Sequence, residues 1–253
     1  MSFWVMILLG VVQGLCEFLP VSSSGHLVLL SSLFGVQDSL LVSIILHVAT
    51  LIAVLVSFRK DVFRMIKNPF STEVIHLAIA TISTCLIAIV LMPMLEGSFD
   101  GKILPITFAL SGVFLFLSEK NAKRQTGSSI SKKQALIIGV AQGMALFPGL
   151  SRSGTTISAG LLAGSDKKEC AKFSFLLSIP TILGSLLLEI MDLSKHQMPI
   201  NVNVAGIIFG GVIAFLIAFS TIKFMINLTE KTNFKWFGIY LFIMAIVSLV
   251  IFW

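Results

Sequence analysis

Charged residues are scarce in this sequence of 253 residues, because Asp, Glu, Lys and Arg together make up only 12 % of it. A soluble domain usually contains about 25 % charged residues. Here 56 % of the residues are hydrophobic and the mean hydropathy is +1.00. This composition excludes an ordinary soluble enzyme and predicts an integral membrane protein. The net charge of +6 is no sign of nucleic-acid binding, because the cations lie in short loops between apolar runs, where they orient membrane proteins.

Disulfide and zinc-binding patterns are also missing. The three cysteines, Cys16, Cys85 and Cys170, lie in or beside apolar segments, and the sequence contains no CxxC pair and no cluster of His and Cys. A disulfide framework or a zinc site is therefore not expected. The apolar run 3–12 lacks a preceding positive charge and continues into polar residues, which argues against a cleaved signal peptide.

Long apolar runs dominate what the sequence does contain. A membrane-spanning helix needs about 20 apolar residues. Five runs approach this length, at residues 40–58, 74–95, 173–191, 202–222 and 236–253, and a shorter run at 103–118 suggests a sixth span. The sequence therefore predicts an all-α polytopic membrane protein with about six transmembrane helices.

Four other apolar runs are too short to cross a membrane, and they form two pairs: about 3–15 with 27–36, and 134–146 with 156–164. Pro20 and Pro148 interrupt the pairs, and the Ser-rich stretch after each proline can cap a new helix. We expect each pair to form a re-entrant helical hairpin. The irregular centre of such a hairpin must be buried in protein or line a cavity.

The two hairpins are copies of each other. Residues 10–35, GVVQGLCEFLPVSSSGHLVLLSSLFG, align without a gap with residues 139–164, GVAQGMALFPGLSRSGTTISAGLLAG. Each hairpin precedes three spans, so internal repeats cover 1–118 and 134–253 of a single membrane domain, 1–253. Because three is an odd number, the second half begins on the opposite side of the membrane, which predicts an inverted-topology repeat.

The loop charges predict the orientation. The loops 59–73 and 119–133 are rich in Lys and Arg, whereas the loop between them contains Glu96, Asp100 and a single cation, Lys102. Lysine and arginine favour the cytoplasmic side. Both termini should therefore lie outside. The first hairpin should enter the membrane from outside and the second from inside.

The two copies differ where chemistry is expected. The first contains Glu17, Ser23 and His26, whereas the second contains Arg152. These differences predict one composite site where the hairpins meet. An ionisable residue at membrane depth is a sign of function, although a Glu bonded to a neighbouring helix is the structural alternative. Gln13 lies one helical turn before Glu17 on the same face, and their oxygens suit a hard cation such as Mg²⁺ or Ca²⁺ that also binds phosphate and water.

Both copies place hydroxyl groups at a predicted helix start. Ser22, Ser23 and Ser24 precede Gly25 and His26 in the first copy. The second copy contains Ser151, Arg152, Ser153, Gly154, Thr155 and Thr156 in the equivalent place. Free N–H groups at a helix N-terminus bind phosphate, although capping alone would account for one serine. A hydroxyl beside an imidazole suits a nucleophile with its base, or a phosphate ligand with an acid.

Arg152 is the strongest single indication of function. A guanidinium inside a membrane protein needs an anionic partner, and its planar fork matches the oxygens of a phosphate. An internal ion pair with Glu17 is the structural alternative, and both can hold when no substrate is bound. We expect His47, inside a span, to make an interhelix hydrogen bond. Glu189, near the outer end of another span, is expected to be solvated at the interface.

At these residues the chain resembles the undecaprenyl-diphosphate phosphatase family, the bacitracin-resistance type of membrane phosphatase. One shared motif runs from Gln13 through Glu17 to Ser22-Ser23-Ser24-Gly25-His26, and the other is Pro148-Gly-Leu-Ser-Arg-Ser-Gly-Thr-Thr156. Many members have Glu where this chain has Gln13, so this chain offers one carboxylate where those members offer two.

The resemblance implies an inner-membrane (plasma-membrane) bacterial enzyme with its site facing the outer side. It implies hydrolysis of a C55 polyprenyl diphosphate to the monophosphate, for cell-wall synthesis and bacitracin resistance, with a divalent cation required. Glu17 would be a metal ligand or an acid–base group, and Arg152 would clamp the phosphate. Ser23 would be the nucleophile and His26 its partner. Residues implied to bind phosphate are Ser22, Ser24, Gly25, Ser151, Ser153, Gly154 and Thr156. The group that attacks phosphorus can be water, Ser23 or His26. A homodimer is also compatible with the sequence.

Two other functions are compatible with parts of this pattern. The acid-phosphatase-like lipid phosphatases also use Ser-Gly-His, but they need a second His soon after Ser-Arg and an Arg-Pro motif. Here no His follows Arg152 until His196, and no Arg-Pro occurs. A polyprenyl-phosphate transporter or flippase fits the inverted repeat. Transport needs only an anion binder, however, whereas hydrolysis also needs the nucleophile and acid that the Ser-Gly-His motif offers.

Overall fold

The computed structural model of the chain describes residues 2–36, 39–95, 97–121, 129–195, 204–229 and 233–253. This part of the chain is helical and contains no strand. Its helices are α1 (Phe3–Cys16), α2 (Ser23–Phe34), α3 (Ser39–Ser57), α4 (Arg59–Lys67), α5 (Thr72–Leu95), the 3-10 helix η1 (Ser98–Asp100), α6 (Leu104–Asn121), α7 (Lys132–Met144), α8 (Arg152–Leu162), α9 (Lys167–Lys195), α10 (Val204–Thr229) and α11 (Lys235–Phe252). The predictions that fall on 122–128 and on His196 lie outside the described residues.

Within the described residues, five helices are long and apolar enough to cross a membrane. These segments are Leu40–Ser57, Thr72–Leu95, Lys167–Asp192, Val204–Thr229 and Lys235–Phe252. The predicted all-α polytopic membrane protein is thereby confirmed. The sixth predicted span, 103–118, is helical in α6, which lies outside this group of five, so its crossing of the membrane stays a prediction.

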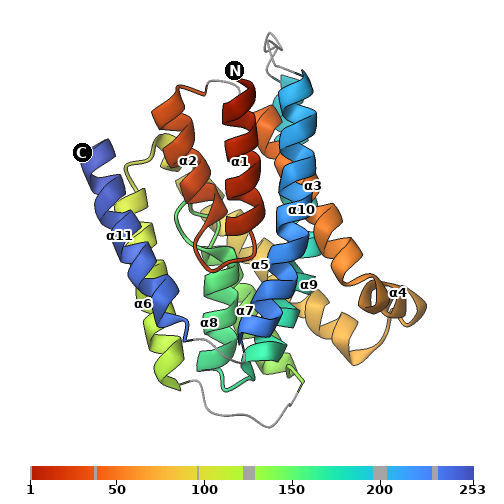
Figure 1. Cartoon of the computed structure of the whole chain (residues 1–253). Coiled ribbons are helices and arrows are strands. Elements are labelled where there is room, and N and C mark those ends of the chain that lie inside the picture. The colour runs from red at the N-terminus through yellow and green to blue at the C-terminus, as the bar shows by residue number, and fades with distance from the viewer. Residues whose placement is uncertain (1, 37–38, 96, 122–128, 196–203, 230–232) are drawn as a thin grey trace.

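Two pairs of short helices occupy the positions predicted for the hairpins. In Figure 1, α1 and α2 run between the end of the bundle that holds both termini and its middle, whereas α7 and α8 occupy the opposite half. A serine caps the second helix of each pair: Ser22 Oγ accepts from the Gly25 N–H at 3.3 Å, and Ser151 Oγ accepts from the Gly154 N–H at 3.0 Å. The breaks expected around the two prolines therefore lie in the interior of the bundle.

Glycines allow the hairpins to lie directly against long helices of the other half. A Cβ built on Gly10 of α1 would lie 2.3 Å from the carbonyl oxygen of Gly210 in α10. A Cβ on Gly139 of α7 would lie 2.3 Å from the carbonyl oxygen of Ala80 in α5. Small residues permit this close backbone approach between membrane helices. Gly10 and Gly139 are equivalent in the repeat, so the same contact forms twice.

The first part of the basic loop after the first span forms helix α4. Ion pairs connect α4 with α5 and α9: Arg64 contacts Glu73 of α5 at 2.8 Å, and Lys172 of α9 contacts Asp61 at 2.9 Å. Within α4, Arg64 also contacts Asp61 at 2.6 Å. These basic side chains at this end of the bundle are thus paired with acidic ones.

Candidate active site

A cavity of about 1140 Å³ lies between the two hairpin turns and helices α3, α5 and α9. Its polar lining includes the predicted site residues Glu17, Ser22, Ser23, Ser24, Ser151, Arg152 and Ser153. Apolar residues of α5 and α9, among them Ala88, Met92 and Leu188, line another part of its wall. The cavity therefore joins a polar group of side chains to an apolar surface.

The hairpin turns touch each other beside this cavity. Ser153 Oγ at the start of α8 donates to the carbonyl oxygen of Leu19 at 2.9 Å. A Cβ on Gly25 would lie 2.8 Å from the Cα atom of Gly149, so only glycine allows the two backbones to approach this closely. Two hydroxyls of α6 hold the second turn from behind, since Thr107 Oγ1 donates to the carbonyl of Pro148 at 2.7 Å and Ser111 Oγ accepts from the Ser151 N–H at 2.9 Å.

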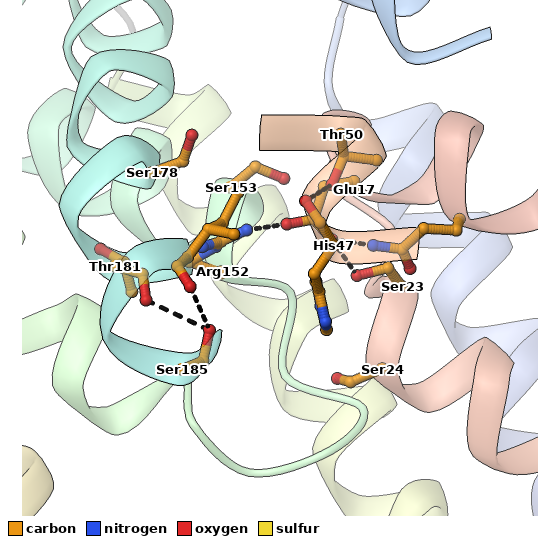
Figure 2. A network of polar contacts seen from close by, with 12 residues as sticks. Glu17, Ser23, Ser24, His47, Thr50, Arg152, Ser153, Ser178, Thr181 and Ser185 are labelled. Atoms are coloured by element: carbon orange, nitrogen blue, oxygen red, sulfur yellow. Dashed lines mark hydrogen bonds and ion pairs between the residues drawn. The ribbon is translucent and has the colours of Figure 1, made fainter. Parts of the chain in front are cut away.

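Glu17 lies at the centre of this contact and bonds residues of both hairpins. One carboxylate oxygen forms an ion pair with the Arg152 guanidinium (Figure 2). The other accepts from Ser23 Oγ at 2.6 Å and from Gln13 Nε2 at 3.1 Å. The Glu17 side chain is 2 % exposed, whereas that of Arg152 is 20 % exposed and lines the cavity. The acid of one copy and the guanidinium of the other are thus brought together, and Arg152 remains accessible to a ligand.

The first turn holds Ser22 in an unusual backbone conformation. Its φ of 67° and ψ of 98° make it the one non-glycine residue with positive φ in the described part of the chain. Such conformations cost about 1–3 kcal/mol and persist where the surroundings enforce them, often at functional sites. Ser22 Oγ also lies 3.4 Å from Ser24 Oγ. The strain occurs where the predicted phosphate-binding hydroxyls line the cavity.

His26 lies behind the cavity lining. Its Nδ1 donates to the carbonyl oxygen of Ser22 at 2.7 Å, so the Nε2 of a neutral ring accepts from the Tyr240 hydroxyl at 2.7 Å. The ring also packs edge-on against Phe108, with centroids 5.5 Å apart. His26 therefore positions the start of α2 in this structure, and its predicted role as acid–base partner of Ser23 stays a prediction. Sequence reasoning missed Tyr240, although the one tyrosine of the chain within an apolar run was a signal.

Three residues predicted to bind phosphate bond mainly to the protein. Thr156 Oγ1 lies 2.6 Å from Ser174 Oγ and donates to the carbonyl of Arg152 at 2.9 Å. Gly154 donates its N–H to the capping Ser151, as Gly25 does to Ser22. None of the three lines the cavity, and their contact with substrate stays a prediction.

The residues predicted to bind a metal were Gln13 and Glu17. The Oε1 atom of Gln13 is buried and has no hydrogen-bond partner, and it lies on the side chain whose Nε2 bonds Glu17. Among the described residues no group of three or more His, Cys, Asp and Glu side chains is placed to hold a metal. The available oxygens fit a hard divalent cation only if phosphate and water complete its coordination.

The cavity contains a second polar group that sequence reasoning did not assign to the site. Ser43 and His47 of α3 and Glu189 of α9 line its wall. The expectation that Glu189 is solvated at the interface was wrong, because its side chain is 21 % exposed and bonds Ser43 Oγ at 3.1 Å. His47 Nδ1 lies 3.5 Å from Glu189 Oε1 of α9, but the hydrogen bond of His47 is with Ser43 Oγ of the same helix at 3.1 Å, so the expected interhelix hydrogen bond stays a prediction. The sequence signal for this group is an acid within an apolar run.

Comparison with known proteins agrees with the motifs that form this site. A family model described as "Bacitracin resistance protein BacA" matches residues 6–247. A protein of Carboxydothermus hydrogenoformans named undecaprenyl-diphosphatase is 38 % identical over 259 residues, which cover 99 % of this chain and 98 % of the relative. Proteins with the same name from Christiangramia forsetii and Methanobrevibacter smithii are 36 % and 37 % identical, and the alignments cover 99 % and 95 % of this chain and 98 % and 94 % of those relatives. The chain therefore belongs to the family of the bacitracin resistance protein BacA.

Proposed function

We propose that this chain is an undecaprenyl-diphosphatase, which hydrolyses undecaprenyl diphosphate to undecaprenyl phosphate and inorganic phosphate and so recycles the lipid carrier for cell-wall synthesis. The observation that carries the proposal is Arg152, a guanidinium that lines the polar end of a cavity whose other wall is apolar. A diphosphate head group matches the guanidinium and the two serine-rich helix starts. The apolar residues of α5 and α9 offer a surface for the prenyl chain.

In the proposed mechanism the substrate's terminal phosphate binds to Arg152 and to the hydroxyls of Ser22, Ser24, Ser151 and Ser153. Ser23 is the nucleophile, and Glu17, which accepts its hydrogen bond at 2.6 Å, takes its proton. The bond from phosphorus to the bridging oxygen breaks, and undecaprenyl phosphate leaves with the electron pair. Water then hydrolyses the phosphoseryl group.

A divalent cation, Mg²⁺ or Ca²⁺, is part of the proposal. Glu17 would hold it with Gln13 Oε1, the buried oxygen that has no partner. When bound, it would neutralise charge that develops on the phosphate oxygens. The remaining steps are performed by the side chains described above.

The proposed topology is an inverted repeat, with each hairpin followed by three spans. It is supported by the reciprocal contacts, because α1 packs on α10 of the second half while α7 packs on α5 of the first. It is also supported by Figure 1, in which the two hairpins approach the middle of the bundle from opposite ends.

Release of phosphate tests the function directly. Purified protein in detergent should convert undecaprenyl diphosphate to the monophosphate, with one inorganic phosphate released for each substrate consumed, and a Ser23→Ala variant should not. A transporter would bind the lipid and release no phosphate, so a folded wild-type protein without release would refute hydrolysis.

The site is proposed to open to the outer side of the membrane. The cavity lining reaches Phe99 and Asp100 of η1, Asp192 of α9 and Phe252 of α11, whereas the cations of α4 and of the start of α7 lie at the other end of the bundle (Figure 1). Lysine and arginine favour the cytoplasm.

Cysteine labelling in intact cells should therefore give opposite results at the two ends. After replacement of the native cysteines, Phe99→Cys should react with an impermeant maleimide from outside, whereas Lys133→Cys should react only after lysis. Position 99 is accessible to the reagent, because the Phe99 side chain is exposed. Ser23→Cys should react slowly from outside and be protected by substrate. The reverse pattern at positions 99 and 133 would overturn the orientation.

A further inference from the structure

We propose that His47 is the general base that activates the hydrolytic water, and that Ser43 and Glu189 position it. This inference rests on the proposed function, and it assigns the proton-accepting imidazole to α3, away from both repeated motifs. His47 lines the cavity that contains Glu17, Ser23 and Arg152. Figure 2 shows its ring pointing into the space between Ser24 of α2 and Ser185 of α9.

Hydrogen-bond directions fix the tautomer of His47. Ser43 Oγ donates its one proton to Glu189 Oε1 at 3.1 Å. It lies 3.1 Å from His47 Nδ1, so it must accept a proton from that nitrogen. A neutral His47 therefore carries its proton on Nδ1, and its Nε2 presents a lone pair. No described residue bonds Nε2. A free imidazole nitrogen in a cavity with a carboxylate behind the ring is the arrangement that a general base needs.

Glu189 is suited to stabilise the charge that His47 acquires. Its Oε1 is 3.5 Å from His47 Nδ1, and its buried Oε2 has no hydrogen-bond partner. No lysine or arginine among the described residues forms an ion pair with it. When Nε2 takes a proton, the imidazolium becomes the cation beside this carboxylate.

The other two acid–base groups of the site are less suited to this step. Both oxygens of Glu17 are already engaged, one by Arg152 and the other by Ser23 and Gln13. Both ring nitrogens of His26 are bonded to Ser22 and Tyr240, and His26 does not line the cavity. Among the histidines that the structure describes, only His47 combines a free nitrogen with a place on the cavity wall.

The oxygen of water forms a bond to the phosphorus of phosphoserine 23 while one of its protons passes to His47 Nε2. The bond between phosphorus and Ser23 Oγ breaks, the electron pair stays on Oγ, and Oγ recovers the proton that Glu17 took during the first step. Inorganic phosphate leaves, and His47 then loses its proton to solvent in the cavity.

The test compares His47→Asn with wild type in purified, folded protein. Asparagine keeps a donor near the position of Nδ1 for Ser43 and has no group in place of Nε2. We expect kcat for phosphate release to fall about 10²-fold, which is the lower end of the range for a lost general base. KM should fall with it, so that kcat/KM stays within about threefold of wild type, because only the hydrolysis of the covalent intermediate is slowed. Because the first step is intact, protein quenched in acid after turnover of substrate labelled in the terminal phosphate should retain label, and Ser23→Ala should remove it.

Two further variants separate chemistry from folding. Glu189→Gln keeps the hydrogen bond to Ser43 but removes the charge, and it should lose about tenfold in kcat and retain label to a smaller extent. Ser185→Ala removes another cavity hydroxyl one turn earlier on α9 and should stay within about threefold of wild type. A His47→Asn protein with near wild-type turnover, or a slow one without retained label, would overturn the assignment while wild-type phosphate release still supported the phosphatase function.

Discussion

Arg152→Lys should release phosphate from undecaprenyl diphosphate about 10³-fold more slowly than wild type. A lysine keeps the positive charge and its pairing with Glu17, but it cannot present two parallel N–H groups to one phosphate. Removal of one preorganised donor costs about 10²–10³-fold in kcat, and Arg152 is the one guanidinium that lines the cavity in the described structure. Arg64→Lys is a matched control, because Arg64 is paired with Asp61 and Glu73 at the far end of the bundle and should leave turnover unchanged.

Arg152→Ala separates the catalytic role of the guanidinium from its structural role. It should be as inactive as the lysine variant and also less stable than that variant. The reason is that the Glu17 carboxylate, with 2 % of its side chain exposed, loses its positively charged partner. Breaking one side of a buried ion pair costs about 3–5 kcal/mol. Removing both charges, in Arg152→Ala with Glu17→Ala, should restore most of the melting temperature and none of the activity. Wild-type turnover in Arg152→Lys would refute the clamp and leave Arg152 as a structural partner of Glu17.

The sequence predicted the hairpins because their signals are local. Helix breaks at Pro20 and Pro148, serine caps after them and the gap-free alignment of the two copies are all properties of neighbouring residues. The meeting of Glu17 and Arg152 was also predictable, since one copy carries an acid and the other a guanidinium beside the helix break. The structure places the two side chains in an ion pair, which is the internal pair that the sequence offered as the structural alternative.

Other features depend on tertiary contacts that no local pattern encodes. A helix start fixes the direction of backbone N–H groups but not the rotamer of His26, whose ring bonds Tyr240, 214 residues away. The pairing of His47 with Glu189 depends on how α3 packs against α9. Sequence reasoning could identify each of these polar residues within an apolar run, but not its partner.

Glu17→Gln should abolish metal-dependent phosphate release, with a loss of at least about 10³-fold. An amide still accepts from Ser23, but it can neither take the proton of the nucleophile nor bind a hard cation as a charged carboxylate does. It also leaves Arg152 without its anion, so the variant should bind inorganic phosphate more tightly than wild type does. Full turnover with unchanged metal dependence would make Glu17 a structural residue.

Gln13→Glu tests the cation by stability as well as by activity. Gln13 Nε2 donates to Glu17 Oε2 at 3.1 Å, so a glutamate at position 13 replaces this donor with a second carboxylate oxygen at a similar distance. Two buried carboxylates this close repel each other unless they share a proton or a cation. Without divalent cations the variant should melt at a lower temperature than wild type. Mg²⁺ or Ca²⁺ should raise the melting temperature of the variant by more than that of wild type, and should keep or increase its turnover.

The Gln142→Glu variant is the matched control, because Gln142 holds the same place in the second copy and bonds Thr84 and Thr181 instead of an acid. If cations stabilise both variants equally, or neither, then Gln13 and Glu17 do not form the cation site, and the charge of the substrate must be balanced by Arg152 and the two helix starts alone.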